Sequence, residues 1–292
     1  MDWLERMNQS LDYIEEHLTE DIDNSELAKI VCCSAYHFTR MFSFISGVTL
    51  SEYIRRRRLS MAALELQNSN VKILDLALKY RYDSPTAFTR AFRSTHGVAP
   101  VDAKSAGVRL KSYPKMSFLI KIKGDVSMNY RIENKERFTV IGLKEKMTGA
   151  VDSRENANRM MEIWSNLTEE KAGEIMSLSN GYIDGLIGIT ANDNGKEFDY
   201  YVAATTDNKI GVTNMSLLDV PASTWAVFDC VGALPNSIGE AWKRIFAEWF
   251  PSSGYENADH PCLEVYFDGD VTSDNYKCEL WLPIIKSKSY RV

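Results

Sequence analysis

The chain has 292 residues, of which 45% are hydrophobic and 25% charged, and its formal net charge is −6. This is the composition of a folded globular protein, and the length is enough for two ordinary domains. No apolar run approaches the roughly 18 residues of a membrane-spanning helix. The acidic N-terminus also lacks the basic start of a signal peptide, so we expect a cytoplasmic protein.

The apolar residues of the first third recur at three- and four-residue spacing, which predicts helices. The Thr49-x-x-Glu52 capping box should open the longest of them, and Ser84-Pro85 should open the last. The predicted helices cover residues 3–18, 25–31, 34–47, 50–68, 72–80 and 84–97. They should form two small cores that are bridged by the helix over 50–68.

The same short helical module is written twice in this region, at an offset of 49 or 50 residues. Such a tandem suggests two helices presented side by side, which is a way to read DNA at two points. The recurring pairs are Leu27-Ala28 with Leu76-Ala77, Phe38-Thr39-Arg40-x-Phe42 with Phe88-Thr89-Arg90-x-Phe92, and Gly47-Val48 with Gly97-Val98.

The repeated region is a basic island in an acidic chain. Residues 27–108 carry twelve Lys or Arg against five Asp or Glu, whereas residues 1–26 carry one against nine. A basic surface of this kind suits the phosphates of DNA, although a merely solvated face would have the same charge.

Burial of the apolar residues should turn the polar residues of two helices outward. Arginine can bind a guanine edge with two hydrogen bonds, and threonine can contact a base or the thymine methyl group. Arg40 and Arg90 could instead clamp phosphates, and His37 could be a phosphate or packing contact. The predicted DNA-binding residues are Tyr36, His37, Thr39, Arg40, Thr86, Thr89, Arg90 and Arg93.

The run Arg55-Arg56-Arg57-Arg58 spans a full helical turn, so its four side chains cannot all face DNA. At least one of them should form an internal ion pair or lie along the core.

The helical spacing of apolar residues ends after Ala103. We place the domain boundary at 107/108, giving domains 1–107 and 108–292. Residues 117–148 alternate in the manner of strands, as at 118–123 and 138–143. Two β-α-β-β units should follow, and together they predict an α+β domain with a duplicated sheet. Their segments are 138–148, 154–167, 183–190 and 197–205, then 222–231, 237–250, 262–268 and 277–285.

The tandem unit resembles the AraC/XylS family of transcription regulators over residues 3 to about 104. The resemblance is carried by Leu27-Ala28, Ser34-Ala35-Tyr36-His37-Phe38-Thr39-Arg40-x-Phe42, Tyr53-Ile54-Arg55-Arg56-Arg57-Arg58-Leu59, and Ala87-Phe88-Thr89-Arg90-x-Phe92 through Gly97-Val98-x-Pro100.

Residues 117–288 resemble the GyrI-like effector-binding domain, and the order of the two domains resembles the Rob-type regulators. The second resemblance is carried by Thr139-Val140-Ile141-Gly142-Leu143, Trp249-Phe250-Pro251, Leu263-Glu264-Val265-Tyr266 and Cys278-Glu279-Leu280-Trp281-Leu282-Pro283.

The two resemblances imply a multidomain fold, with an all-α tandem helix-turn-helix part of homeodomain-like type before the α+β effector domain. They also imply a DNA-binding transcription regulator, an activator by expectation, that a small hydrophobic or cationic effector modulates. The implied partners are double-stranded DNA, read at two adjacent major-groove segments, and RNA polymerase.

Strand alternation suggests where the effector binds. If 262–268 and 277–285 are neighbours, then Glu264, Tyr266, Glu279 and Trp281 could share one face, where two carboxylates and two rings would suit an organic cation. The GyrI-like resemblance implies Glu279 as the acidic residue, with Glu264 second. Further candidates are Trp225 and Tyr201, with Tyr200 as the alternative to Tyr201.

Two other functions fit parts of the sequence. Some GyrI-like domains are hydrolases, although the chain has no Ser-His-Asp pattern, HExxH motif or P-loop, so we expect no enzyme. A ligand-free protein-interaction domain is the other alternative. The five cysteines show no C-x-x-C spacing, and Cys32-Cys33 near His37 does not make a metal set, so neither a metal nor a cofactor is expected.

Overall fold

The structure is a computed structural model that describes residues 3–287, except residues 106, 120–126, 150, 152, 195, 209 and 211. Contacts divide the chain into two compact units. One comprises residues 1–39 and 48–123, and the other comprises residues 40–47 and 124–292.

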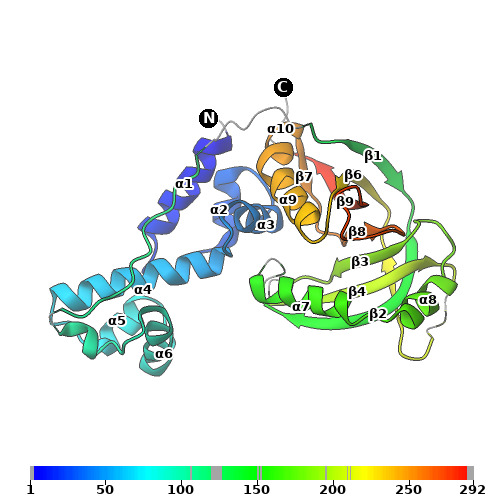
Figure 1. Cartoon of the computed structure of the whole chain (residues 1–292). Coiled ribbons are helices and arrows are strands. Elements are labelled where there is room, and N and C mark those ends of the chain that lie inside the picture. The colour runs from blue at the N-terminus through cyan, green and yellow to red at the C-terminus, as the bar shows by residue number, and fades with distance from the viewer. Residues whose placement is uncertain are drawn as a thin grey trace. The chain divides into compact units, whose positions relative to one another are not determined.

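The N-terminal third is helical, as the sequence predicts (Figure 1). Each predicted helix is present, and its ends differ from the prediction by at most two residues. The helices are α1 (Trp3–Glu16), α2 (Asn24–Val31), α3 (Ala35–Ser46), α4 (Leu50–Asn68), α5 (Ile73–Lys79) and α6 (Pro85–His96), and a short 3-10 helix, η1 (Asp102–Lys104), follows them.

The helix ends are defined by side-chain caps. The Thr49 hydroxyl accepts the Glu52 backbone N–H at 3.2 Å, and the Ser84 hydroxyl accepts the Ala87 N–H at 3.1 Å. Pro85 occupies the first position of α6, where the missing N–H leaves no hydrogen bond unmade.

Helix α4 contributes to two sets of buried residues. Its C-terminal half packs with α5 and α6 around Leu59, Leu76, Phe88 and Phe92. Its first turn buries Leu50 and Tyr53, and α1 and α3 bury further apolar residues: Met7, Leu11, Phe38 and Phe42. The structure therefore contains the predicted core at the C-terminal half of this helix.

The arginine run on α4 makes internal contacts, as its position on a single helical turn requires. Arg57 donates to both carboxylate oxygens of Glu15 on α1, at 2.8 and 2.6 Å, and also to the backbone oxygen of Tyr113. Arg58 donates to the backbone oxygens of Leu18 and Glu20. At least two of the four arginines therefore hold the helical unit together.

The second unit is an antiparallel sheet with helices (Figure 1). Its strands are β1 (Tyr130–Lys135), β2 (Phe138–Thr148), β3 (Leu186–Ala191), β4 (Glu197–Thr206), β5 (Ser216–Val220), β6 (Ser223–Val231), β7 (Tyr255–Asn257), β8 (Cys262–Tyr266) and β9 (Lys277–Lys286). Its helices are α7 (Arg154–Ser165), α8 (Glu169–Ser177), α9 (Asn236–Arg244), the π-helix η2 (Ile245–Trp249) and α10 (Phe250–Ser253).

The strand order is β1-β6-β9-β8-β3-β4-β2-β5, and β7 also pairs with β9. Both predicted β-α-β-β segments are present, as β2-α7-β3-β4 and β6-α9-β8-β9. These two halves of the sheet meet where β3 pairs with β8. Strands β5 and β7 and helix α8 were not predicted, and β1 lies in the alternating segment 117–148 without having been delimited there. The predicted strand at 118–123 lies largely outside the described residues, and Phe118 and Leu119 are not in a strand.

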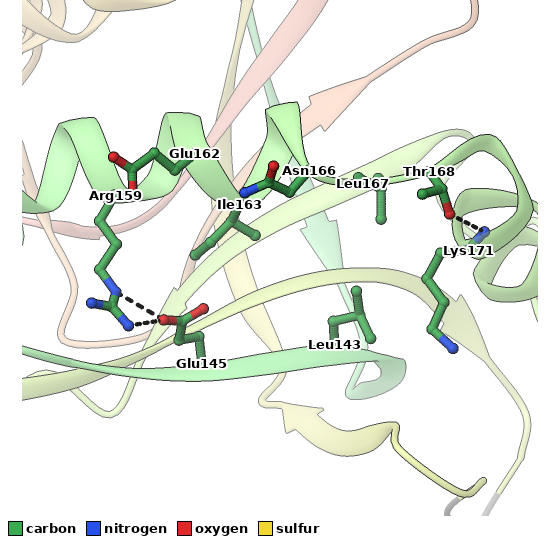
Figure 2. A pocket seen from close by; sticks show the side chains of 9 residues that line it. All are labelled: Leu143, Glu145, Arg159, Glu162, Ile163, Asn166, Leu167, Thr168 and Lys171. Carbon is green, nitrogen blue, oxygen red and sulfur yellow. Dashed lines mark hydrogen bonds and ion pairs between the residues drawn. The ribbon is translucent and has the colours of Figure 1, made fainter.

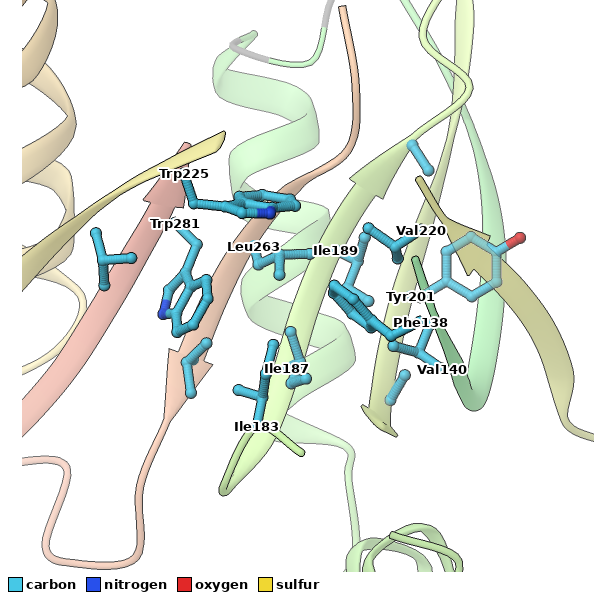
Figure 3. Packing of buried hydrophobic residues seen from close by; sticks show 14 residues of the cluster. Phe138, Val140, Ile183, Ile187, Ile189, Tyr201, Val220, Trp225, Leu263 and Trp281 are labelled. Atoms are coloured by element: carbon cyan, nitrogen blue, oxygen red, sulfur yellow. The ribbon is translucent and has the colours of Figure 1, made fainter. Parts of the chain in front are cut away.

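The sheet has two different faces. The helix-covered face bears Tyr200, Gly188, Glu264 and Tyr266, and α7 and α9 pack over it. The opposite face bears a buried apolar cluster that includes Ile187, Ile189, Tyr201, Leu263 and Trp281 (Figure 3). Among the helices that the structure describes, none is long and apolar enough to span a bilayer.

Candidate functional site

Helix α6 presents a polar face to solvent. Phe88 and Phe92 are buried on one side, whereas Thr86, Arg90 and Arg93 are exposed on the other. A shallow hollow on this exposed side is lined by Pro85, Thr86, Thr89, Arg90, Arg93 and Ser94. The outward placement predicted for Thr86, Arg90 and Arg93 is therefore found, and Thr89 is half-buried.

Helix α3 differs from the prediction that its polar residues face outward. His37 and Arg40 are buried, at 4% and 6% exposure, and Tyr36 and Thr39 are half-buried. The Arg40 guanidinium lies over the ring of Phe44, one turn along the helix, at 5.7 Å from its centroid. It also lies over the Trp242 ring, at 5.1 Å from its centroid, so side chains from outside α3 cover this side of the helix.

A carboxylate lies between aromatic side chains on the helix-covered face of the sheet. Glu264 of β8 accepts the indole N–H of Trp242, from α9, at 2.9 Å. Its other oxygen accepts the hydroxyl of Tyr266 at 2.8 Å. One donor comes from a helix and the other from the same strand, so the carboxyl group is held at both oxygens.

The other half of the duplicated domain contributes a second aromatic pair. The indole N–H of Trp164, on α7, donates to the Tyr200 hydroxyl of β4 at 2.7 Å. The Trp164 ring packs edge-on against Tyr266, with centroids 4.6 Å apart. Trp164 and Trp242 thus bring the helices of both halves to one place, and we call Glu264, Tyr266, Tyr200, Trp164 and Trp242 the Glu264 cluster.

Gly188 of β3 leaves the space that the Glu264 cluster occupies. A Cβ atom at this position would lie 2.7 Å from the Tyr200 hydroxyl oxygen and 3.4 Å from a Glu264 oxygen. A glycine inside a strand often marks such a close approach.

Burial dominates the acid–base properties of the cluster. It raises the pKa of the Glu264 carboxyl, and the hydrogen bonds from Trp242 and Tyr266 and the positive charge of Arg40 only partly oppose it. Burial also raises the pKa of the Tyr200 and Tyr266 hydroxyls well above their ordinary value, so both stay protonated.

The raised pKa of Glu264 gives a pH prediction for any cation that binds there. A bound cation favours the ionised carboxylate, so binding releases a proton and affinity should rise with pH through the pKa of the free protein. Below that pKa, affinity should fall by up to about tenfold per pH unit. Titration of one cation at several pH values checks this, and an affinity independent of pH would contradict it.

Glu279 and Trp281 do not belong to this cluster, although they were predicted to lie beside Glu264 and Tyr266. In the β8–β9 ladder Val265 is opposite Glu279, and Glu264 is opposite Leu280. Directly opposed residues share a face, so the two carboxylates lie on opposite faces of the sheet. The sequence fixes alternation within each strand but not the register between strands.

Glu279 also has partners already. Arg131 of β1 donates to both of its oxygens, at 2.7 and 3.1 Å, and the Trp281 indole N–H donates to it at 2.8 Å. Lys135 lies over the Trp281 ring, at 5.4 Å from its centroid. The Glu279 carboxylate is therefore already part of an ion-pair network with Arg131, which also pairs with Glu133 and Asp229.

Tyr201 and Trp225 likewise lie in the apolar cluster of the opposite face, apart from Glu264 (Figure 3). Trp225 packs against Trp281, with ring centroids 6.1 Å apart. Of the six predicted effector-binding residues, Glu264 and Tyr266 therefore lie together on the helix-covered face. Tyr200 replaces Tyr201, and Trp164 and Trp242 were not among the predicted effector-binding residues.

A separate hollow of about 470 Å³ lies between α7, the start of α8 and β2 (Figure 2). Arg159 donates to Glu145 across it, at 2.8 Å from the guanidinium Nε, and Lys171 is paired with Glu174. Glu162 also lines the hollow, and the Glu264 cluster differs from this site in holding its carboxyl group among aromatic side chains.

Comparison with known proteins assigns both parts of the chain. Residues 128–285, more than half of the chain, match the family described as the GyrI-like small molecule binding domain, and residues 27–105 match a helix-turn-helix domain. The chain belongs to the GyrI-like family and carries an AraC-type helix-turn-helix domain. Both resemblances seen in the sequence are thereby confirmed.

The names of relatives of this GyrI-like protein describe transcription regulators or DNA-binding proteins. The transcriptional activator AarP of Providencia stuartii is 38% identical over 94 residues, which are 32% of this chain and 70% of AarP. The right origin-binding protein of Escherichia coli K12 is 39% identical over 88 residues, which are 30% of each chain. The chain is a transcriptional regulator of the AraC/Rob type.

A solved structure resembles the GyrI-like part. The protein SAV2435, bound to tetraphenylphosphonium, has a TM-score of 0.50 and 22% sequence identity. The match covers 56% of this chain and 98% of that one, and it shows a shared fold.

Proposed function

We propose that this regulator reads a two-part DNA site and changes transcription when a small lipophilic cation binds at the Glu264 cluster. The observation that carries the proposal is the buried carboxyl of Glu264, which lies among indole and phenol groups. Aromatic rings attract an organic cation through their faces and bury its apolar surface, and a carboxylate supplies the opposite charge.

Recognition of DNA is assigned first to the exposed side of α6. Arg90 and Arg93 project from it together with Thr86, and these side-chain types read base edges in the major groove. His37 and Arg40 are buried on α3, so the second reading point that the repeated module supports falls to the half-buried Tyr36 and Thr39, about one helical turn, or roughly 34 Å, along the DNA. One chain could then bind a two-part site as a monomer.

Replacing Arg90 by alanine tests the first reading point. The Arg90→Ala variant should lose about 1–3 kcal/mol of binding free energy on its specific site and much less on random DNA. Binding can be measured by fluorescence anisotropy with DNA selected from a randomised pool. Arg159→Ala, which removes the same charge from the second unit, should bind like the wild type. Equal losses on both DNAs would assign Arg90 to a phosphate instead.

The ligand class can be tested with tetraphenylphosphonium as the cation probe and triphenylphosphine oxide as its neutral counterpart. Both bring three or more phenyl rings, and only the first carries a charge. Tryptophan fluorescence should report binding, because Trp164 and Trp242 are part of the cluster. Selective binding of the cation probe supports the proposal, and equal binding of both compounds would point to a purely apolar site.

We also propose that the cation-bound form activates transcription through RNA polymerase. The name of AarP as an activator supports this sign of regulation. A ligand can shift the equilibrium between two states only if it binds them with different affinity. Run-off transcription from the selected DNA should therefore increase when the cation probe is added. A decrease would instead indicate a repressor.

A further inference from the structure

The segment that follows the helix-turn-helix domain lies along its helices. Residues 108–118, which we call the strap, contact three places in the first unit. At its start, Leu110 packs against the buried cluster around Leu59 and Phe88. The strap therefore begins on the second helix-turn-helix module, and this contact explains why the first unit extends past the predicted boundary at 107/108.

The middle of the strap is held by α4. The Ser60 hydroxyl accepts the Tyr113 backbone N–H at 2.9 Å, and Arg57 donates to the Tyr113 backbone oxygen. The Arg56 guanidinium lies over the Tyr113 ring, at 5.0 Å from its centroid. Three side chains from one helical turn thus fix a single strap residue.

The end of the strap is held by α1 of the first module. The side-chain amide of Asn8 donates to the Phe118 backbone oxygen at 3.0 Å and accepts the Phe118 N–H at 2.8 Å. Tyr53 accepts the Met116 N–H at 3.3 Å. Asn8 satisfies both backbone groups of one residue, as a neighbouring strand would, and the Phe118 side chain is buried.

We infer that the strap sets the spacing between the two helix-turn-helix modules and thereby selects DNA sites by the distance between their two parts. The α4 helix is one connection between the modules, and the strap is a second one that runs from the core of one to α1 of the other. A helix held at both ends by a second connection has less freedom to bend or twist. This inference rests on the two-part reading proposed above.

The test uses a full-length variant that should release the strap while leaving the apolar residues of both cores unchanged. The double variant Asn8→Ala, Ser60→Ala removes the hydrogen bonds to Phe118 and Tyr113, and alanine favours the helices that carry both positions. The matched control is Asn68→Ala, Ser69→Ala. It changes the same residue types at the end of α4, where both side chains bond only to α4 carbonyls.

Two measurements test whether the strap is released and whether it sets the spacing of the half-sites. Hydrogen exchange at the Tyr113 and Phe118 amides should accelerate in the strap variant and stay unchanged in the control. In selection from a randomised DNA pool, the wild type and the control should recover two half-sites at one spacing. The strap variant should recover the same half-sites at several spacings. Its preference for the best spacing over one longer by a base pair should fall by about tenfold, which is about 1.4 kcal/mol.

The possible contrary results are distinct. Unchanged exchange in the strap variant would show that these hydrogen bonds do not hold the strap, and the inference would fail. Accelerated exchange with the wild-type spacing preference would show that the strap does not set the spacing. If the wild type itself selects a single half-site, the two-part reading fails, and the inference fails with it.

Discussion

Replacement of Glu264 by glutamine is expected to remove most of the affinity for the cation probe. Glutamine keeps the shape of the side chain and an oxygen that can accept the Trp242 N–H, but it has no negative charge. Losing the charged partner of a buried cation costs about 2–3 kcal/mol or more, so the dissociation constant should rise at least about 30-fold. Isothermal titration calorimetry on the full-length protein measures it.

Glu279→Gln is the matched control because it makes the same change fifteen residues away, on the other face of the sheet. Arg131 and Trp281 already bind this carboxylate, so cation affinity should stay within about threefold of the wild type. The neutral probe should bind both variants equally. If Glu279→Gln abolishes binding and Glu264→Gln does not, the effector site lies on the opposite face, and the proposed site is wrong.

The helical part of the fold could be predicted because its signals are local. Periodic apolar residues define each helix, and caps such as Thr49 and Ser84 mark where a helix begins within a few residues of sequence. The tandem repeat added the pairing of the two modules. The exposed face of α6 follows from the same periodicity, since burial of Phe88 and Phe92 leaves Arg90 outside.

The proposed effector site could be predicted only in part because it depends on register between strands. Alternation places Glu264 with Tyr266, and Glu279 with Trp281, correctly within each strand. Which pair faces the helices depends on long-range pairing, and a shift by one residue would exchange the two faces. The short strand β1 (Tyr130–Lys135) carries Arg131, the partner of Glu279; it lies in the alternating segment 117–148, but its ends and its pairing with β6 were not predicted.

Trp242 shows a different limit of prediction from the sequence. It lies in the predicted helix over 237–250, but a tryptophan on a helix is more often part of a core than of a binding site. Its role becomes visible only when α9 is placed over β8, where the indole N–H meets the Glu264 carboxylate. The burial of His37 and Arg40 on α3 is a similar case, because periodicity does not show which sides of a helix are covered.

Arg57→Met is expected to destabilise the helix-turn-helix unit by about 3 kcal/mol. The Arg57 and Glu15 side chains are nearly buried, at 11% and 16% exposure, and their charges neutralise each other between α4 and α1. Methionine fills similar space but cannot donate to Glu15. The Glu15 carboxylate then keeps the hydrogen bond from the Tyr53 hydroxyl and loses its opposite charge. The melting temperature of this unit should fall by about 12 °C or more, which circular dichroism can follow.

Two further variants separate lost charge pairing from lost packing. In the double variant Arg57→Met, Glu15→Leu no charge is left buried, so most of the lost stability should return. Arg56→Met, one residue along the same helix, removes a half-exposed partner of Glu52 and should cost less than about 1 kcal/mol. If the double variant is less stable than Arg57→Met alone, the stability of the unit depends on the packing of these side chains. The account based on an uncompensated carboxylate would then be wrong.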